Sequence, residues 1–177
     1  MTHWYDDSGV PRLLGHVHPT ATEGTAVFDL ERLNRALAYI EAHPERHMQS
    51  AWLVKLTCGT GGCIAGWVTM EEYPAGTPEG FLVEGHLGET YSRLNVGDRT
   101  VEVPDEAASL LGVTAAQSDV LFYGNNTLGD LKAMRDALAA NPTAPASDLM
   151  RVASWRDDEG LNELVAFERE HPEAAVR

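Results

Sequence analysis

The residues best suited to chemistry are concentrated in the run Thr-Cys-Gly-Thr-Gly-Gly-Cys-Ile-Ala-Gly-Trp-Val-Thr-Met, residues 57–70, which holds both cysteines of the chain. The glycines predict a turn, and Thr60 among them predicts a helix N-cap, which puts Cys63 at the third helical position. Free backbone N–H groups at a helix start attract anions and lower the pKa of a thiol. The sequence therefore predicts a ligand-binding or anion-binding turn. Its residues are Cys58, Gly59, Thr60, Gly61, Gly62 and Cys63.

A thiol in the first turn of a helix also suits a nucleophile. Its position resembles the nucleophile of papain-like enzymes, whose signature is Cys-Gly-Ser-Cys-Trp, although Gly61 and Gly62 lengthen the spacing here and Ile64 replaces the tryptophan. His86 and Asp98 are the candidates for the base and its orienting partner. This alternative predicts a cysteine-dependent hydrolase or transferase.

Three other roles are open to the two cysteines. Free cysteine is among the most buried residue types, and we favour this reading, in which both fill a buried turn. A metal site would need Cys58, Cys63 and two of the three histidines His43, His47 and His86, but structural zinc usually takes a second closely spaced pair. A cytosolic location argues against a disulfide. We therefore expect no metal and no other cofactor.

The surrounding pattern resembles a family of short uncharacterised bacterial and phage proteins that carry Cys-Gly-Thr-x-x-Cys-Ile-Ala-Gly-Trp, a motif that the chain matches from Cys58 to Trp67. The resemblance covers about residues 43–125. It implies no activity and marks the turn as the signature of the family. Its flanking residues are His43-Pro44-Glu45, Gln49, Trp52, Ala108, Leu111-Gly112-Val113 and Leu121-Phe122.

Composition limits the classes of partner. The chain has 177 residues, of which 44% are hydrophobic and 23% charged, and this suits one globular domain with a sizeable core. A net charge of −14 argues against binding to nucleic acid or to anionic membranes, because both need clustered Lys and Arg. Residues 107–114 resemble the front of a helix-turn-helix, but the following helix, Thr114 to Tyr123, has no Lys or Arg. A protein partner with a basic surface fits this charge best.

Local signals predict the elements that position the turn. Asp29 caps a helix that Pro44 ends, and a short helical turn can follow. Asp105 to Leu111 is a helix that ends at Gly112, and residues 51–57 fit either a strand or a helix. Further helices start at the capping box of Thr114 and Gln117, which predicts an end at Gly124, and at Thr127 with Asp130. Short antiparallel strands are predicted at Phe81 to Glu84, Thr90 to Asn95 and Thr100 to Val103.

These elements predict a helix-rich α+β protein with a small antiparallel β-meander between residues 80 and 104. We divide the single domain, residues 1–177, into an extended arm (1–26), a core (27–156) and an acidic C-terminal helix (157–177). The segment 157–173 has seven acidic residues against one arginine. The first ten residues are polar and no apolar run approaches the ~18 residues of a membrane span, so we expect a cytoplasmic protein. The sequence does not specify the oligomeric state.

The function that we predict is a non-enzymatic, acidic protein-binding factor, and the family resemblance suggests an accessory factor of a phage or mobile element. The acidic C-terminal helix is the candidate docking surface. Its apolar positions, which include Leu161, Leu164 and Phe167, predict that one side contributes to the core while the acidic side faces outward.

Overall fold

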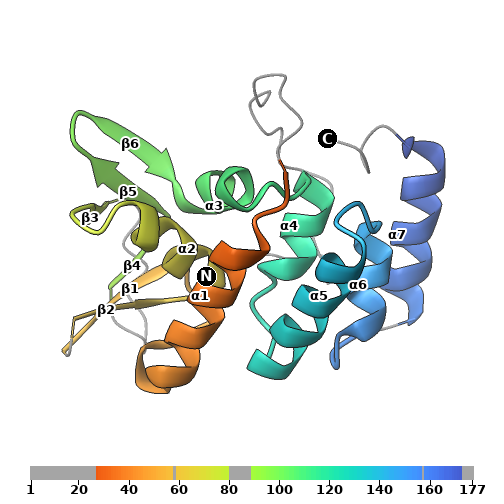
Figure 1. The fold of residues 1–177 in the computed structure, drawn as a ribbon, viewed down its shortest axis with the longest axis horizontal. Helices are drawn as coiled ribbons and strands as arrows, with labels where there is room; N and C mark the ends of the chain where they lie inside the picture. The colour runs from red at the N-terminus through yellow and green to blue at the C-terminus, as the bar shows by residue number, and fades with distance from the viewer. Residues whose placement is uncertain (1–26, 58, 80–88, 157, 173–177) are drawn as a thin grey trace.

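The computed structural model describes residues 27–57, 59–79, 89–156 and 158–172 (Figure 1). These residues form seven α-helices, one short 3-10 helix and two three-stranded antiparallel sheets, which confirms the helix-rich α+β class. The predicted arm, residues 1–26, lies outside the described residues. The elements are α1 (Leu30–Ala42), η1 (Pro44–Arg46), β1 (Leu53–Leu56), β2 (Gly59–Gly62), α2 (Ile64–Glu72), β3 (Thr77–Glu79), β4 (Glu89–Tyr91), β5 (Arg93–Val96), β6 (Arg99–Glu102), α3 (Val103–Leu111), α4 (Ala115–Leu121), α5 (Leu128–Ala140), α6 (Ala146–Val152) and α7 (Asp158–Glu170).

Side-chain caps start α1, α4 and α5 where the sequence predicted them, whereas α3 starts at Val103, two residues before the predicted Asp105. The carboxylate of Asp29 accepts a hydrogen bond from the backbone N–H of Arg32 at 2.8 Å, which satisfies a donor in the first turn of α1. Complete capping boxes start α4, at Thr114 with Gln117, and α5. These starts depend on residues three positions apart, and local sequence specifies them for that reason.

The end of α4 differs from the prediction. We expected this helix to end at Gly124, but its last residue is Leu121. The side-chain amide of Asn126 donates hydrogen bonds to the carbonyls of Val120 and Leu121, at 2.8 and 2.9 Å. Because this buried side chain satisfies the final carbonyls, the chain can leave the helix before the glycine is reached.

The strands belong to two sheets, with the orders β2-β1-β4 and β3-β5-β6. We predicted one strand from Thr90 to Asn95, but a bend at Ser92 divides it into β4 and β5, which pair in different sheets. The carbonyl of Ser92 accepts a hydrogen bond from the N–H of Val103 at 2.8 Å, so the bend is tied to the start of α3. The strand predicted at Phe81 to Glu84 lies outside the described residues.

One continuous core connects the sheets to the helices. Helix α2 packs against α1 and α3, while α1 also packs on α5, and α6 lies between α5 and α7 (Figure 1). The position of α2 among its neighbours agrees with the absence of charged residues from Ile64 to Met70. Large side chains that are fully buried come from all these layers and include Leu33, Ile40, Leu53, Ile64, Leu94, Leu111, Leu131 and Met134.

Candidate functional site

The cysteine- and glycine-rich stretch contains the second strand of a β-hairpin and the helix after it, where we had predicted a turn and a helix capped by Thr60. Strand β2 pairs with β1 along its whole length, from Leu53 opposite Gly62 to Leu56 opposite Gly59. Helix α2 begins only after this strand, at Ile64, and Cys63 is its N-cap. The prediction that Thr60 caps the helix and that Cys63 occupies the third helical position is therefore wrong. Pairing with β1, the other strand of the hairpin, keeps residues 59–62 extended.

Two glycines make room for the backbone of Trp52. A methyl group placed on Gly62 would lie 2.4 Å from the carbonyl oxygen of Trp52, and one on Gly66 would lie 2.0 Å from the same atom. Real carbon–oxygen contacts of this kind are well over 3 Å, so neither position accepts a side chain without movement of β1. The glycines thus allow a close backbone approach between the segment at Trp52 and the first turn of α2.

Contacts within the chain use the backbone donors at the start of α2. The N–H of Cys63 donates to the carbonyl of Ala51 at 2.8 Å, and the N–H of Ile64 donates to the side-chain oxygen of Gln49 at 3.2 Å. The predicted anion-binding turn depended on free donors at this place. In the structure both N–H groups donate to acceptors of the chain itself, so neither is available to an anion. Cys58 lies outside the described residues.

Gln49 is the residue whose role the sequence did not indicate. Its side chain is buried, and besides Ile64 it contacts His47 Nε2 at 3.1 Å and donates to the carbonyl of Tyr123 at 3.3 Å. It therefore joins the start of α2 to the segment that follows α4. A polar side chain with three such contacts is a structural link, and only the tertiary arrangement reveals it.

The environment of Cys63 suppresses its ionisation. The side chain is 0% exposed, and its thiol lies 3.8 Å from the carbonyl of Trp52, to which it donates weakly. Burial raises the pKa of the thiol to about 11, and the backbone N–H groups of Gly66 and Ala65 oppose this increase only in part. A nucleophilic cysteine needs an accessible sulfur and a lowered pKa. In the described structure Cys63 has neither property.

The other members of the proposed triad do not complete a site in the described residues. His86 lies outside them, and Asp98 is an exposed residue of the turn that joins β5 to β6. Of the two described histidines among the candidate metal ligands, the ring of His43 lies 4.5 Å from that of Tyr39, and His47 contacts Gln49. No group of three or more His, Cys, Asp or Glu side chains able to hold a metal occurs in the part of the chain that the structure describes.

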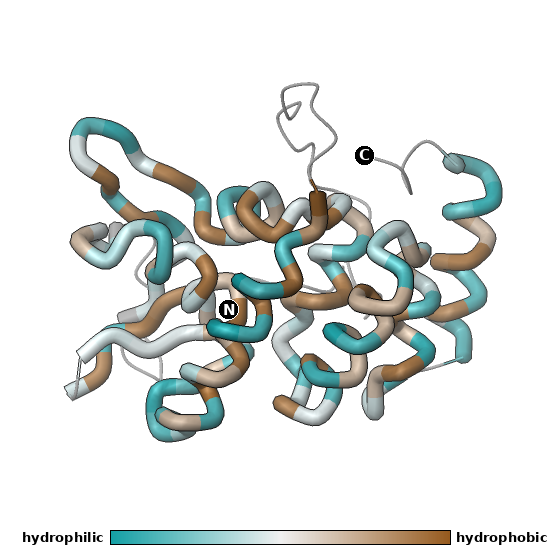
Figure 2. Tube along the Cα trace, viewed as in Figure 1, coloured by the Kyte–Doolittle hydropathy of each residue, from teal (hydrophilic) through white to brown (hydrophobic). Residues whose placement is uncertain are grey.

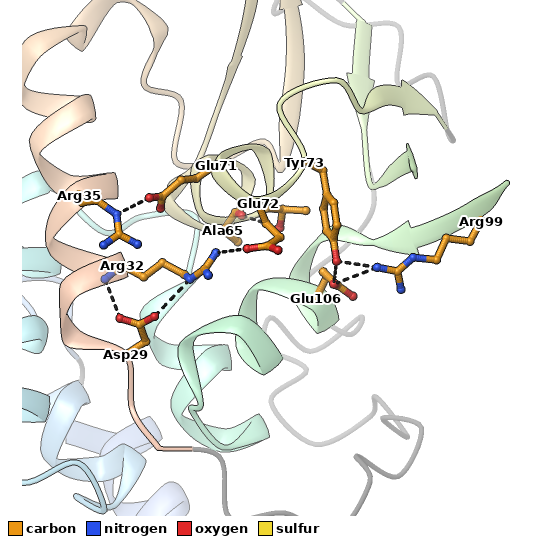
Figure 3. Close-up of polar contacts among 10 residues, drawn as sticks. Asp29, Arg32, Arg35, Ala65, Glu71, Glu72, Tyr73, Arg99 and Glu106 are labelled. Atoms are coloured by element: carbon orange, nitrogen blue, oxygen red, sulfur yellow. Dashed lines mark hydrogen bonds and ion pairs between the residues drawn. The ribbon is translucent and has the colours of Figure 1, made fainter. Parts of the chain in front are cut away.

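Ion pairs compensate many carboxylates elsewhere on the molecule. Arg32 bridges Asp29 and Glu72, which ties α1 to α2, and Arg35 makes a second bridge to Glu71 (Figure 3). On the other side of α2, the hydroxyl of Tyr73 donates to Glu106, and Arg99 donates to the same hydroxyl at 2.6 Å (Figure 3). The hydrogen bond to Glu106 is the main cause of the raised pKa of Tyr73. These charges stabilise the packing of neighbouring elements. Such partly exposed pairs contribute little free energy each.

Several acidic side chains of helix α7 have no ion-pair partner among the described residues. Asp158, Glu159, Glu163 and Glu170 are exposed, and no ion pair with another described residue involves any of them. Hydrophobic and hydrophilic bands alternate along this helix (Figure 2), and Leu164, its buried residue, faces the protein. We define these four carboxylates as the acidic face of α7.

Comparison of the chain with models of protein families, with curated proteins and with solved structures gives no match. Among the described helices, none combines the length and the apolar character that a membrane span requires.

Proposed function

We propose that the protein is a non-enzymatic, cytoplasmic binding protein and that the acidic face of α7 docks a protein partner with a basic surface. The observation that carries the proposal is the exposure of Asp158, Glu159, Glu163 and Glu170 without ion-pair partners among the described residues. Carboxylates on α1, α2 and β6 have arginine partners of their own, so α7 is the described element with the most uncompensated negative charge.

The spacing of three of these residues makes an ordered ridge within the acidic face. Glu159, Glu163 and Glu170 stand four and seven residues apart, so they share one side of the helix. At a rise of 1.5 Å per residue, the ridge is about 16 Å long. A surface of this length fits a helix or strand with several Lys or Arg residues. Complementary charge on such a partner would speed association and suppress the wrong partners.

The alternative function, a cysteine-dependent hydrolase or transferase, receives no support from the described residues, because Cys63 is buried and its pKa is raised. The net charge of −14 also favours a basic protein over a nucleic acid. The resemblance to phage and bacterial proteins suggests that the protein is an accessory factor of a phage or mobile element. In such a factor, binding to a partner would be the whole activity.

Affinity capture with a charge-reversed variant tests the proposal. The tagged protein is used to capture partners from a lysate of its source cells at increasing salt, and the Glu163→Lys variant is compared with Asp98→Lys. Both substitutions change the net charge by the same amount at exposed carboxylates, but Asp98 lies at the tip of the β5–β6 hairpin. We expect Glu163→Lys to lose the partner, and Asp98→Lys to retain it. Binding of the parent should weaken as salt rises.

Equal losses in the two variants would show that only net charge matters, and the assignment to α7 would then be wrong. Capture that neither substitution nor salt affects would contradict an electrostatic docking surface altogether. Circular dichroism of both variants checks that the fold is unchanged. The helix position of Glu163 and the turn position of Asp98 both accept lysine without backbone strain, because neither residue has a positive φ.

A further inference from the structure

We propose that α7 is a detachable strap, which opens from α6 and closes on it as a unit while the rest of the molecule stays folded. The inference concerns the fold itself, so it holds whether or not the acidic face binds a partner. Three observations support it: the small burial of the helix, its main packing neighbour among the described elements, and a polar contact that clamps it to α6.

The burial of α7 is small for its length. Helices α1, α5 and α7 each have 13 residues, but α5 buries Asp130, Leu131, Met134 and Leu138, whereas Leu164 is the buried residue of α7. Leu161 is only partly buried against the same core. Because apolar burial is the main source of helix stability in a protein, α7 has much less to hold it than α5.

The packing of α7 depends on one neighbour. Among the described elements, α6 is the one against which α7 packs extensively, and the two helices lie together at one end of the molecule (Figure 1). Helix α6 itself is in contact with α4 and α5, which keep it in place. Removal of α7 would therefore leave the contacts of α6 with the core intact.

The carboxylate of Glu168 clamps α7 to α6. Glu168 Oε1 accepts a hydrogen bond from the backbone N–H of Ser147 at 3.0 Å, in the first turn of α6. The N-cap position of α6 is Pro145, which makes no side-chain capping bond, so Glu168 satisfies this donor from another helix. The clamp resembles a helix cap that a neighbouring helix supplies. When α7 separates from α6, water can accept the hydrogen bond from Ser147 in place of Glu168.

Opening would change the surface that α7 offers. Leu161 and Leu164 stand three residues apart on the side opposite the acidic ridge, and both would become accessible. The free helix would then have an acidic stripe and an apolar stripe, which is the form in which helices lie in hydrophobic grooves of partners. The closed state hides the apolar stripe against α6.

Native-state hydrogen exchange of the full chain, followed by mass spectrometry at low urea concentrations, tests the strap. We expect peptides of α7 to exchange at least about tenfold faster than peptides of α5, at a rate that low urea does not change, because a local opening exposes little surface. Exchange of α5 should depend steeply on urea. If α7 and α5 exchange at the same rate with the same urea dependence, α7 opens only in global unfolding and the proposal is wrong.

Matched variants test the clamp. Glu168→Ala should increase the exchange of α7 about three- to tenfold and leave α5 unchanged, as expected for the loss of one hydrogen bond. Glu170→Ala, two residues away on the exposed side, is the control and should change neither. Leu164→Ala should increase exchange of α7 further. Equal effects of Glu168→Ala and Glu170→Ala, or an effect of Glu168→Ala on α5 as large as on α7, would overturn the role of the clamp.

Discussion

Substitution of Gly66 by alanine measures how tightly α2 is packed. An exposed glycine in a helix costs about 1 kcal/mol relative to alanine, so the change would stabilise a protein whose helix faced solvent there. Gly66 is buried, and the added methyl group would lie 2.0 Å from the carbonyl oxygen of Trp52 and 3.0 Å from Leu53 Cδ2. Relief of the closer contact requires a backbone shift of more than an ångström.

The backbone that must shift is held on two sides. Trp52 directly precedes β1, and β1 is the middle strand of its sheet, paired with both β2 and β4. Overpacking of a core typically costs about 1–3 kcal/mol, and a contact with backbone belongs at the upper end of that range. After the gain in helix propensity is subtracted, we expect Gly66→Ala to lower the free energy of unfolding by about 1–2 kcal/mol.

Thermal and urea unfolding, followed by circular dichroism, provide the assay. For a chain of this size, each kcal/mol corresponds to about 2–4 °C in Tm. Gly129→Ala is the matched control, because Gly129 is exposed near the start of α5 and the nearest atom to its added methyl, Thr127 Oγ1, is 3.5 Å away. We expect this control to melt at or slightly above the parent. If Gly66→Ala also melts at or above the parent, the close approach of Trp52 to α2 is not a tight contact.

Two further predictions concern buried polar side chains. Gln49→Ala should lower the free energy of unfolding by about 1–3 kcal/mol, because the N–H of Ile64 and the carbonyl of Tyr123 lose their partner, whereas Ser50→Ala at the exposed neighbour should have little effect in urea unfolding. Burial raises the pKa of Asp130, but hydrogen bonds from Thr127 and Ser154 outweigh this effect, so the pKa lies below its ordinary value. Asp130 therefore contributes stability above the unfolded-state pKa of about 3.9, and this contribution is lost as pH falls through the lower folded pKa. In urea titrations at several pH values, the difference between the parent and Asp130→Asn should be largest near neutral pH and shrink in acid; a difference that grows in acid would contradict the assignment.

Local sequence was sufficient to predict the starts of α1, α4 and α5. The side chain of Asp29, the box of Thr114 with Gln117 and that of Thr127 with Asp130 each satisfy donors within the first turn of their own helix. Their effect depends on residues three positions apart, so no knowledge of the tertiary fold is needed. The outward orientation of the acidic side of α7 and the burial of Leu164 also followed from the alternation of charged and apolar positions.

Local sequence was insufficient for the candidate site. The glycines before Cys63 and the threonine among them favour a turn with a cap, and only the pairing with β1 makes them a strand. The end of α4 depended on Asn126, which reaches back to the helix from the following loop. The role of Gln49 depended on partners 15 and 74 residues away. The partners of Gln49 are too far along the chain to leave a periodic signal in a single sequence, and the pairing of β2 with β1 overrides the local preference of its residues for a capped turn.

Thiol reactivity of Cys63 distinguishes a packing role of the cysteine- and glycine-rich stretch from a chemical one. A Cys58→Ser variant leaves Cys63 as the single thiol of the chain. Because the pKa of the buried thiol is raised to about 11, we expect no labelling by iodoacetamide in the folded protein between pH 6 and 9, and complete labelling after unfolding in urea. Rapid labelling of the folded variant near pH 6 would mean an accessible thiolate, and it would contradict both the buried packing of Cys63 and the non-enzymatic function.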